Sequence, residues 1–172
     1  SGSPVDNPPD PVQYALVARA FPDAVLEDPA FEGPAREALR GAEERFSFDA
    51  PVHSWEDVVA LSARVREVCA PACDAFALRH LNIKPSRFGR LRALFDCIAR
   101  AQAAGMALYG GGQFELGVGR DQIEALASLF YPDGANDVAP RAYHGEPHAD
   151  VPPSPLIPLD AQEPGFGFRF RA

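Results

Sequence analysis

Three short apolar runs along the chain each end in a charged residue, and a segment with helical spacing of apolar residues follows each run. The runs are AVLED, RFSFD and HLNIK, which end near Glu27, at Asp49 and at Lys84. Short apolar runs bounded by turn residues are typical of buried strands, and their alternation with helices predicts parallel βα units. Because the carboxyl ends of parallel strands emerge on one face, we expect these two carboxylates and the amine to share one rim.

Apolar spacing and turn residues together define the expected elements. Helices are expected over residues 11–21, 34–44, from 55 onward, 86–104 and 121–130. Strands are expected over residues 24–27, 45–49, 80–84, 106–109 and, as a fifth and very short one, 136–139.

Two features bear on the helix that begins near Trp55. Ser54, with Asp57 three residues later, is predicted to be its N-cap. Residues 61–78 are helical in composition but contain Pro71, so they are predicted to form either one helix broken into two or an insertion.

The number of repeats bounds the architecture. The chain has 172 residues, which leaves room for about five βα units, whereas a complete eight-unit barrel takes about 250 residues. The α/β class therefore comes with two alternatives, a smaller open sheet or the later part of a barrel. Residues 140–164 are rich in proline and the final GFGFRF alternates aromatic with other residues, which predicts an irregular tail with a short terminal strand.

Composition excludes several classes of partner. The net charge is -8 and the pI is about 4.9, so nucleic-acid phosphates would be repelled. No apolar run approaches the roughly 20 residues of a membrane span. The three cysteines form no disulfide framework, which favours a cytoplasmic location. Because Met106 is the only methionine, we expect a trimmed or processed chain, or a piece of a longer one.

Four motifs resemble consecutive barrel strands of the enolase superfamily. LNIKPSRFG and, one helix later, ALYGGGQFELGVGR resemble its sixth and seventh strands, most closely those of the subgroup of muconate-cycloisomerase-like enzymes, o-succinylbenzoate synthases and dipeptide epimerases. AVLEDP and FSFDAPVHS resemble its fourth and fifth strands, although the usual Asp-Glu-Ser is replaced by Asp49-Ala50-Pro51. The resemblance covers roughly residues 24–140. It implies a partial (β/α) TIM barrel in residues 1–140, the C-terminal part of an enolase-type barrel domain, with residues 141–172 as a proline-rich tail and short terminal strand.

The resemblance also implies a site. Glu27 and Asp49 match the family's metal ligands, and Lys84 matches its catalytic lysine. The chemistry asks for these groups, because removing a proton next to a carboxylate produces an unstable enediolate. Mg²⁺, a hard cation that prefers oxygen ligands, neutralises the developing charge. Lys84 is expected to act either as the base or as a cation against the enolate.

The glycine-rich loop is expected to contact the substrate. Gly111 and Gly112 allow close approach of the backbone, Gln113 offers a hydrogen bond, and Glu115 is a carboxylate in or behind the pocket. The alternative is a phosphate-binding loop, but the Lys-Ser/Thr ending of a phosphate loop is absent.

The expected function is that of a Mg²⁺-dependent enzyme, or its C-terminal portion, which removes the proton α to a carboxylate of a small substrate. Dehydration, cycloisomerisation and epimerisation all follow from that step. The family's second-strand lysine pair and third-strand metal ligand would precede Ser1, so we expect either a homo-oligomer or a missing N-terminal half. The alternative is a non-catalytic barrel fragment that acts as an assembly or binding domain.

Overall fold

The computed structural model spans residues 1–172 and describes residues 10–30, 33–68, 77–113, 115, 117–138, 156–158 and 168–170. The α-helices are α1 (Pro11–Ala20), α2 (Gly33–Ala38), α3 (Trp55–Val68), α4 (Leu91–Ala103) and α5 (Val118–Phe130). The strands are β1 (Leu26–Glu27), β2 (Phe46–Phe48), β3 (His80–Ile83), β4 (Ala107–Gly110), β5 (Leu156–Pro158) and β6 (Phe168–Phe170). Two short 3-10 helices, η1 (Glu43–Arg45) and η2 (Pro85–Arg87), precede β2 and follow β3.

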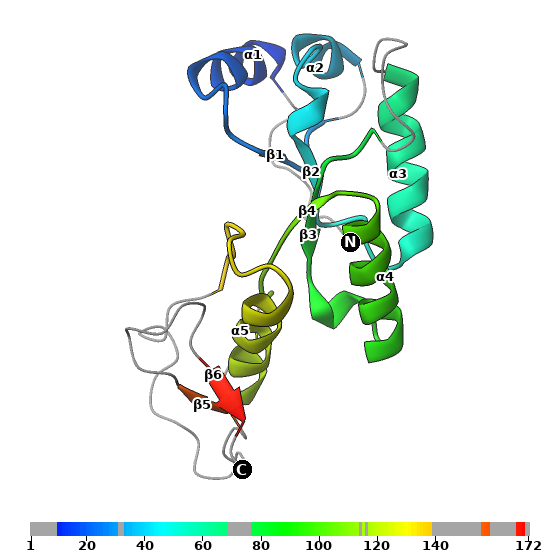
Figure 1. Ribbon diagram of the computed structural model, residues 1–172. Helices are drawn as coiled ribbons and strands as arrows, with labels where there is room; N and C mark the ends of the chain where they lie inside the picture. Colours follow the sequence, from blue (N-terminus) through cyan, green and yellow to red (C-terminus); the bar gives the residue numbers. More distant parts are fainter. Residues whose placement is uncertain are drawn as a thin grey trace.

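The main sheet has the order β1-β2-β3-β4, and every pair in it is parallel. Each strand therefore lies beside the next one along the chain, with helical segments in between (Figure 1). The predicted alternation of parallel strands with helices is confirmed. The expected fifth strand at 136–139 is reduced to one parallel bridge between Gly111 and Asp137, which extends the sheet beyond the end of β4. β5 and β6 form a separate antiparallel pair beside α5.

Three helices differ in length from the sequence prediction. α2 ends at Ala38 instead of residue 44, because the chain turns there and the Gly41 N–H donates to the Glu43 carboxylate at 2.7 Å. α4 begins at Leu91 instead of residue 86. η2 and Gly89, whose φ of 66° suits glycine, separate it from β3. α5 begins at Val118, before the expected residue 121.

The predicted cap of α3 is present. The Asp57 N–H donates to Ser54 Oγ at 3.2 Å, and the Ser54 hydroxyl and the His53 N–H donate to Asp57 Oδ2 at 2.9 and 3.0 Å. Together these bonds make a reciprocal capping box. The predicted break at Pro71 lies outside the described residues, as does most of the chain from residue 139 onward.

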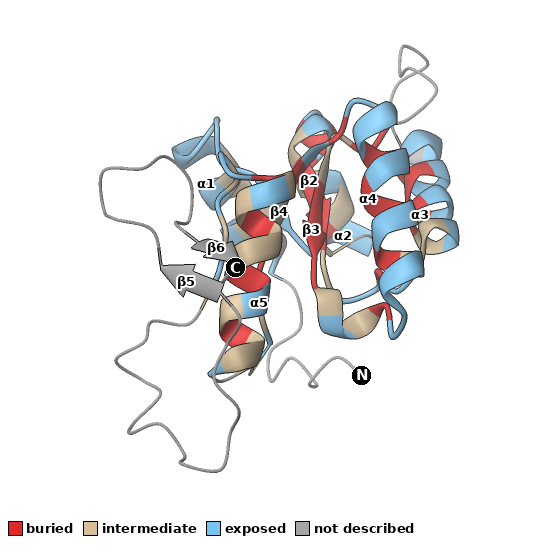
Figure 2. Cartoon of the chain, turned by 60° about the horizontal axis from the view of Figure 1, so that its bottom comes forward, coloured by how far each residue is buried: buried red, intermediate tan, exposed pale blue. Residues whose placement is uncertain are grey.

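The two faces of the main sheet differ in chemistry. Apolar side chains, including Phe48, Leu81 and Ile83, alternate along the strands and join the buried core with residues of α3 and α4. Figure 2 shows β2 and β3 as largely buried strands beside α4. The residues between these apolar side chains are polar. This polar face is made of Glu27, Ser47, His80, Asn82 and Tyr109, which the strand register places side by side.

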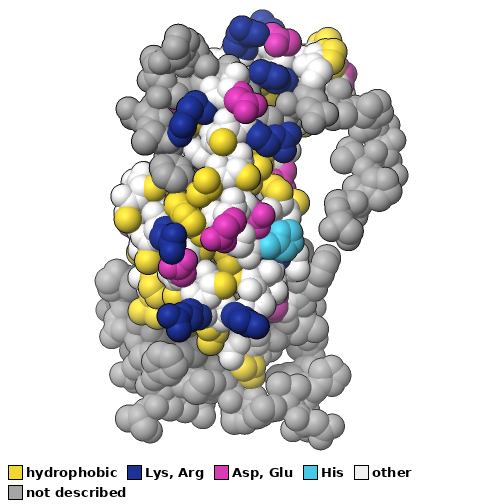
Figure 3. Space-filling view, turned by 90° about the vertical axis from the view of Figure 1, so that its right-hand side faces the viewer, with side chains coloured by type: hydrophobic (Ala, Val, Ile, Leu, Met, Phe, Trp, Pro, Cys, Tyr) yellow, Lys and Arg dark blue, Asp and Glu magenta, His cyan; other side chains and the backbone are white. Residues whose placement is uncertain are grey.

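The described part of the chain contains no helix that is both long and apolar enough to cross a membrane. On the side of the molecule formed by α3 and α4, basic and acidic side chains are interspersed among apolar ones (Figure 3). This surface shows no stripe of one charge.

Candidate active site at the carboxyl ends of the strands

Lys84 is the single lysine of the chain, and its side chain is only 5% exposed. It follows β3 directly, where Pro85 ends the strand and starts η2. Its Nζ donates to Asp137 Oδ2 at 2.6 Å and to the Gly112 carbonyl at 3.1 Å, and lies 3.8 Å from Asp49 Oδ2. The ammonium is thus held between two carboxylates at the carboxyl end of the sheet.

Asp49 follows β2 and faces two cations. Its Oδ1 accepts a short hydrogen bond from Arg87 Nη1, and its Oδ2 faces Lys84. Burial raises the pKa of Asp49, and the two cations only partly oppose that effect. The backbone at this point is fixed by Asp28, whose carboxylate accepts hydrogen bonds from the Asp49 and Ala50 N–H groups at 2.9 and 3.0 Å.

Glu27, at the end of β1, belongs to a separate hydrogen-bond network on the polar face. Its Oε1 accepts from Asn82 Nδ2 at 2.5 Å and from the Tyr109 hydroxyl at 2.8 Å. The Tyr109 oxygen also lies 2.9 Å from Ser47 Oγ. Burial is the main reason that the pKa of Tyr109 is raised. Glu27 and Asp49 are close enough to affect each other electrostatically, but no residue bridges them directly among the described contacts.

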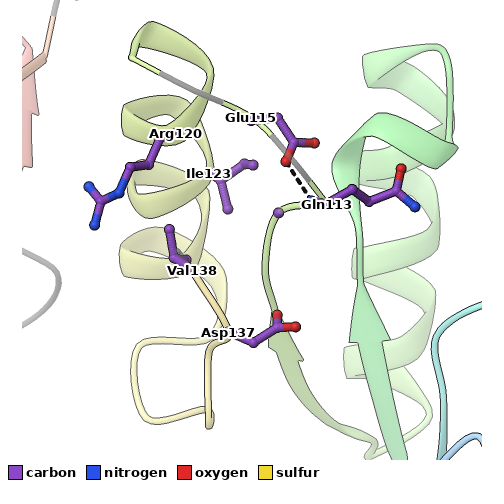
Figure 4. A pocket seen from close by; sticks show the side chains of 7 residues that line it. Gln113, Glu115, Arg120, Ile123, Asp137 and Val138 are labelled. Carbon is purple, nitrogen blue, oxygen red and sulfur yellow. Dashed lines mark hydrogen bonds between the residues drawn. The ribbon is translucent and has the colours of Figure 1, made fainter. Parts of the chain in front are cut away.

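The glycine-rich loop connects the rim to a pocket of about 350 Å³. Gly112, Gln113 and Glu115 line it with Asp137, Ile123, Val138 and Arg120. Glu115 Oε2 accepts from the Gln113 N–H, and the guanidinium of Arg120 lies across α5 from Gln113 (Figure 4). When the Gln113 amide is oriented with its oxygen toward Arg87, that oxygen accepts from Arg87 Nε and Nη2 at 2.9 Å each.

Gly111 lies against the chain segment that follows α5. Its backbone pairs with Asp137, and a Cβ at this position would lie 2.4 Å from the Asp137 carbonyl oxygen. The absence of a side chain therefore lets the chain segment that carries Asp137 approach, and that approach places the Asp137 carboxylate beside Lys84.

The sequence analysis missed four residues of this site. Arg87 stands three residues after Lys84 across the Pro85 turn, and Asp137 lies in the short strand that was expected at 136–139. Asn82 and Tyr109 lie on the polar face, where Asn82 is two residues from Lys84 and therefore on the same side of β3. The sequence offered one signal for them, because every second residue of a strand lies on the same face of the sheet.

The carboxylates fit Mg²⁺ in kind, since Mg²⁺ is commonly held by one or two carboxylates and otherwise by water and substrate. Glu27 and Asp49 supply that donor type from neighbouring strands. Among the described residues, however, no group of three or more His, Cys, Asp and Glu side chains is placed to hold a metal ion. The two carboxylates therefore make a partial set of ligands. One of them, Asp49, also forms an ion pair with Arg87.

Comparison with known proteins places the fold. A family model described as "Domain of unknown function (DUF8230) C-terminal domain" matches residues 1–145. No curated protein matches the chain. Several solved structures do, among them two epimerases and a protein described as an unknown member of the enolase superfamily.

A superfamily member from Enterococcus faecalis V583 is 20% identical, with a TM-score of 0.62 over 96% of this chain and 44% of that one. The dipeptide epimerase from Methylococcus capsulatus, complexed with Mg, is 17% identical, with a TM-score of 0.56 over 93% and 45%. The L-Ala-D/L-Glu epimerase from Bacillus subtilis is 13% identical, with a TM-score of 0.54 over 94% and 45%. The chain thus spans less than half the length of these structures, and the predicted partial α/β barrel is confirmed.

Proposed function

The chain belongs to the DUF8230 C-terminal domain family, and we propose that this member carries part of an active site that removes the proton next to a carboxylate of a small substrate. The observation that supports this most strongly is the placement of the only lysine. Lys84 is buried at the carboxyl end of the sheet, beside a pocket, and not on the surface where lysines usually lie. Buried charged groups of this kind concentrate at functional sites.

Lys84 faces the developing negative charge in this proposal. Its ammonium already donates to Asp137 Oδ2 and the Gly112 carbonyl, so an enolate oxygen in the pocket would replace an existing acceptor. A preorganised donor of this kind stabilises the charge as it forms. The alternative role, as base, requires Lys84 to be a neutral amine that accepts the substrate proton. The hydrogen bond from Lys84 to Asp137 would have to break first.

The loop and the carboxylates complete the proposed site. Gln113 and Glu115 would orient the substrate in the pocket, since both line it. Glu27 and Asp49 would hold Mg²⁺, which when bound supplies positive charge for the substrate carboxylate. The remaining ligand and further substrate contacts would come from an N-terminal half or from a second chain. Dehydration, cycloisomerisation and epimerisation would each follow from the same enolate.

Proton exchange provides a test that does not depend on the final product. L-Ala-D-Glu is a reasonable first probe, because two of the similar structures are dipeptide epimerases. With Mg²⁺ in D₂O, we expect deuterium to enter the α-carbon of the probe, as followed by ¹H NMR. Lys84→Met should abolish the exchange, whereas Arg100→Met, at an exposed ion pair with Asp96, should not. Equal exchange by wild type and Lys84→Met would contradict the proposal.

The alternative, a non-catalytic assembly domain, is favoured by one observation. α1 has no buried residue, and apolar side chains on it and directly after it are largely exposed; these are Val12, Leu16 and Val17 on the helix and Phe21 after it. Mg²⁺ titration with thermal unfolding separates the two functions. A rise in the unfolding temperature that Asp49→Asn abolishes favours the enzyme, and a compact chain indifferent to Mg²⁺ favours the assembly domain.

A further inference from the structure

We propose that Asn82 and Tyr109 are positioning residues, which together saturate one oxygen of Glu27 and leave the other for a ligand. This inference rests on the proposed function, in which Glu27 holds Mg²⁺. It goes further because it says which oxygen of Glu27 is used and which residues of this chain determine that.

Both donors converge on the same atom. Asn82 Nδ2 and the Tyr109 hydroxyl lie 2.5 and 2.8 Å from Glu27 Oε1. Within the described part of the chain, no hydrogen bond or ion pair is made to Oε2. A carboxylate has two oxygens that can accept or ligate. The arrangement therefore presents Glu27 as a one-oxygen ligand with a fixed orientation.

The sheet itself holds the two donors in place. Asn82 and Tyr109 are register partners on β3 and β4, so their side chains emerge together on the polar face. Asn82 is 1% exposed, and Ser47, which contacts Tyr109, is fully buried. Side chains on strands are positioned more precisely than side chains on loops.

The hydroxyls of Tyr109 and Ser47 determine which group donates each hydrogen bond in the network. A hydroxyl carries one proton, and an ionised carboxylate can only accept. The Tyr109 proton is therefore directed to Glu27, and the proton between the two hydroxyls comes from Ser47. Tyr109 thus donates to Glu27 and itself accepts a hydrogen bond from Ser47, as is usual for groups that orient metal ligands.

Asn82 places a hydrogen-bond donor on Glu27 at a cost in local stability. Its Oδ1 is buried and has no hydrogen-bond partner among the residues that the structure describes. A leucine of similar shape would avoid this unsatisfied acceptor. An amide is nevertheless present, with its NH₂ group on Glu27. The donor function accounts for an asparagine at a site where burial alone favours an apolar residue.

Two variants test the inference, with Mg²⁺ affinity measured by calorimetry and stability by thermal unfolding. Asn82→Leu and Tyr109→Phe should each weaken Mg²⁺ binding roughly 10- to 100-fold, the usual effect of removing a residue that orients a ligand. Asn82→Leu should leave the unfolding temperature unchanged or raised, which a merely structural role would not produce. Tyr131→Phe is the matched control. Tyr131 is a buried tyrosine, whereas Tyr109 is half-buried. The Tyr131 hydroxyl has no hydrogen-bond partner among the described residues, so Mg²⁺ affinity should not change.

The outcomes separate this inference from the function on which it rests. Wild-type affinity in both variants, while Glu27→Gln abolishes binding, would overturn the positioning role alone. If Asn82→Leu lowered the unfolding temperature together with the Mg²⁺ affinity, the positioning role would also be overturned, since destabilisation of the fold would then explain the weaker binding. No Mg²⁺ binding by the wild type would overturn the metal assignment and this inference together.

Discussion

At the scale of the residue, Asp49 is where the site depends most on a single side chain. One carboxylate oxygen faces Arg87 and the other faces Lys84. Removing its charge would leave two largely buried cations with fewer acceptors, and groups in that condition are costly. Asp49 is therefore both a candidate ligand and part of the local framework.

We accordingly expect Asp49→Asn to have two effects. Mg²⁺ binding should weaken, and the free energy of unfolding should fall by roughly 1–3 kcal/mol, the usual range for a lost hydrogen bond to a charged group. Asp96→Asn is the control, because Asp96 and Arg100 are both more than half exposed and such pairs contribute little. Denaturant unfolding checks the expectation, and identical curves for Asp49→Asn and wild type would contradict it.

Cys97 is expected to be chemically silent in the folded protein. Its side chain is fully buried, and burial raises the pKa of its thiol to about 12. Because the thiolate is the reactive form, iodoacetamide at pH 8 should leave Cys97 unmodified in native protein and label it in urea. Peptide mass spectrometry distinguishes the two states. Rapid labelling under native conditions would show that α4 opens readily from the sheet.

At the scale of the element, the segment after α5 depends on the lack of a side chain at Gly111. In Gly111→Ala the new Cβ would meet the backbone of Asp137, which cannot rotate away. We expect a loss of about 1–3 kcal/mol, typical of overpacking, and separation of Asp137 from Lys84. Gly112→Ala should cost less, since its Cβ meets the end of the flexible Glu115 side chain. Thermal unfolding of both variants provides the comparison, and equal losses would contradict it.

The sequence predicted those elements whose signals are local. Apolar runs identified β2, β3 and β4, and the Ser54–Asp57 spacing identified the start of α3. The pairing of Asp49 with Arg87 could not be predicted, because it joins residues 38 apart and depends on how a 3-10 turn aims one side chain. The same holds for Tyr109 and Glu27, which are 82 residues apart and meet only because β1 to β4 lie in one order.

At the scale of the whole molecule, an apolar surface lies beside β1, which is an edge strand among the described strands of the sheet. β1 pairs only with β2 among the described strands, and a groove of about 290 Å³ runs between α1 and β1. Of the exposed apolar side chains of α1, Val17 lines this groove together with Val25, and Leu16 precedes Val17 on the same helix. In a barrel, the preceding strand and helix would cover such an edge, and open edges promote association.

We therefore expect this surface to govern association and to contribute little to folding. Leu16 is 59% exposed and Phe21 is 61% exposed, so Leu16→Gln with Phe21→Ser should change the free energy of unfolding by less than about 0.5 kcal/mol. Leu39→Ala is the contrasting variant, because Leu39 is 1% exposed and truncation in a core costs about 2–5 kcal/mol.

Self-association tests the same double variant directly. If a second copy covers α1 in solution, the apparent mass of the wild type in light scattering should rise with concentration, and that of the double variant should stay constant. The reason is that polar side chains remove the gain from burying this face, about 25 cal/mol for each Å² of apolar surface. A wild type that stays monomeric at all concentrations would contradict the expectation that a second copy covers this face. A large loss of stability in the double variant would mean that Leu16 and Phe21 already pack against their own chain.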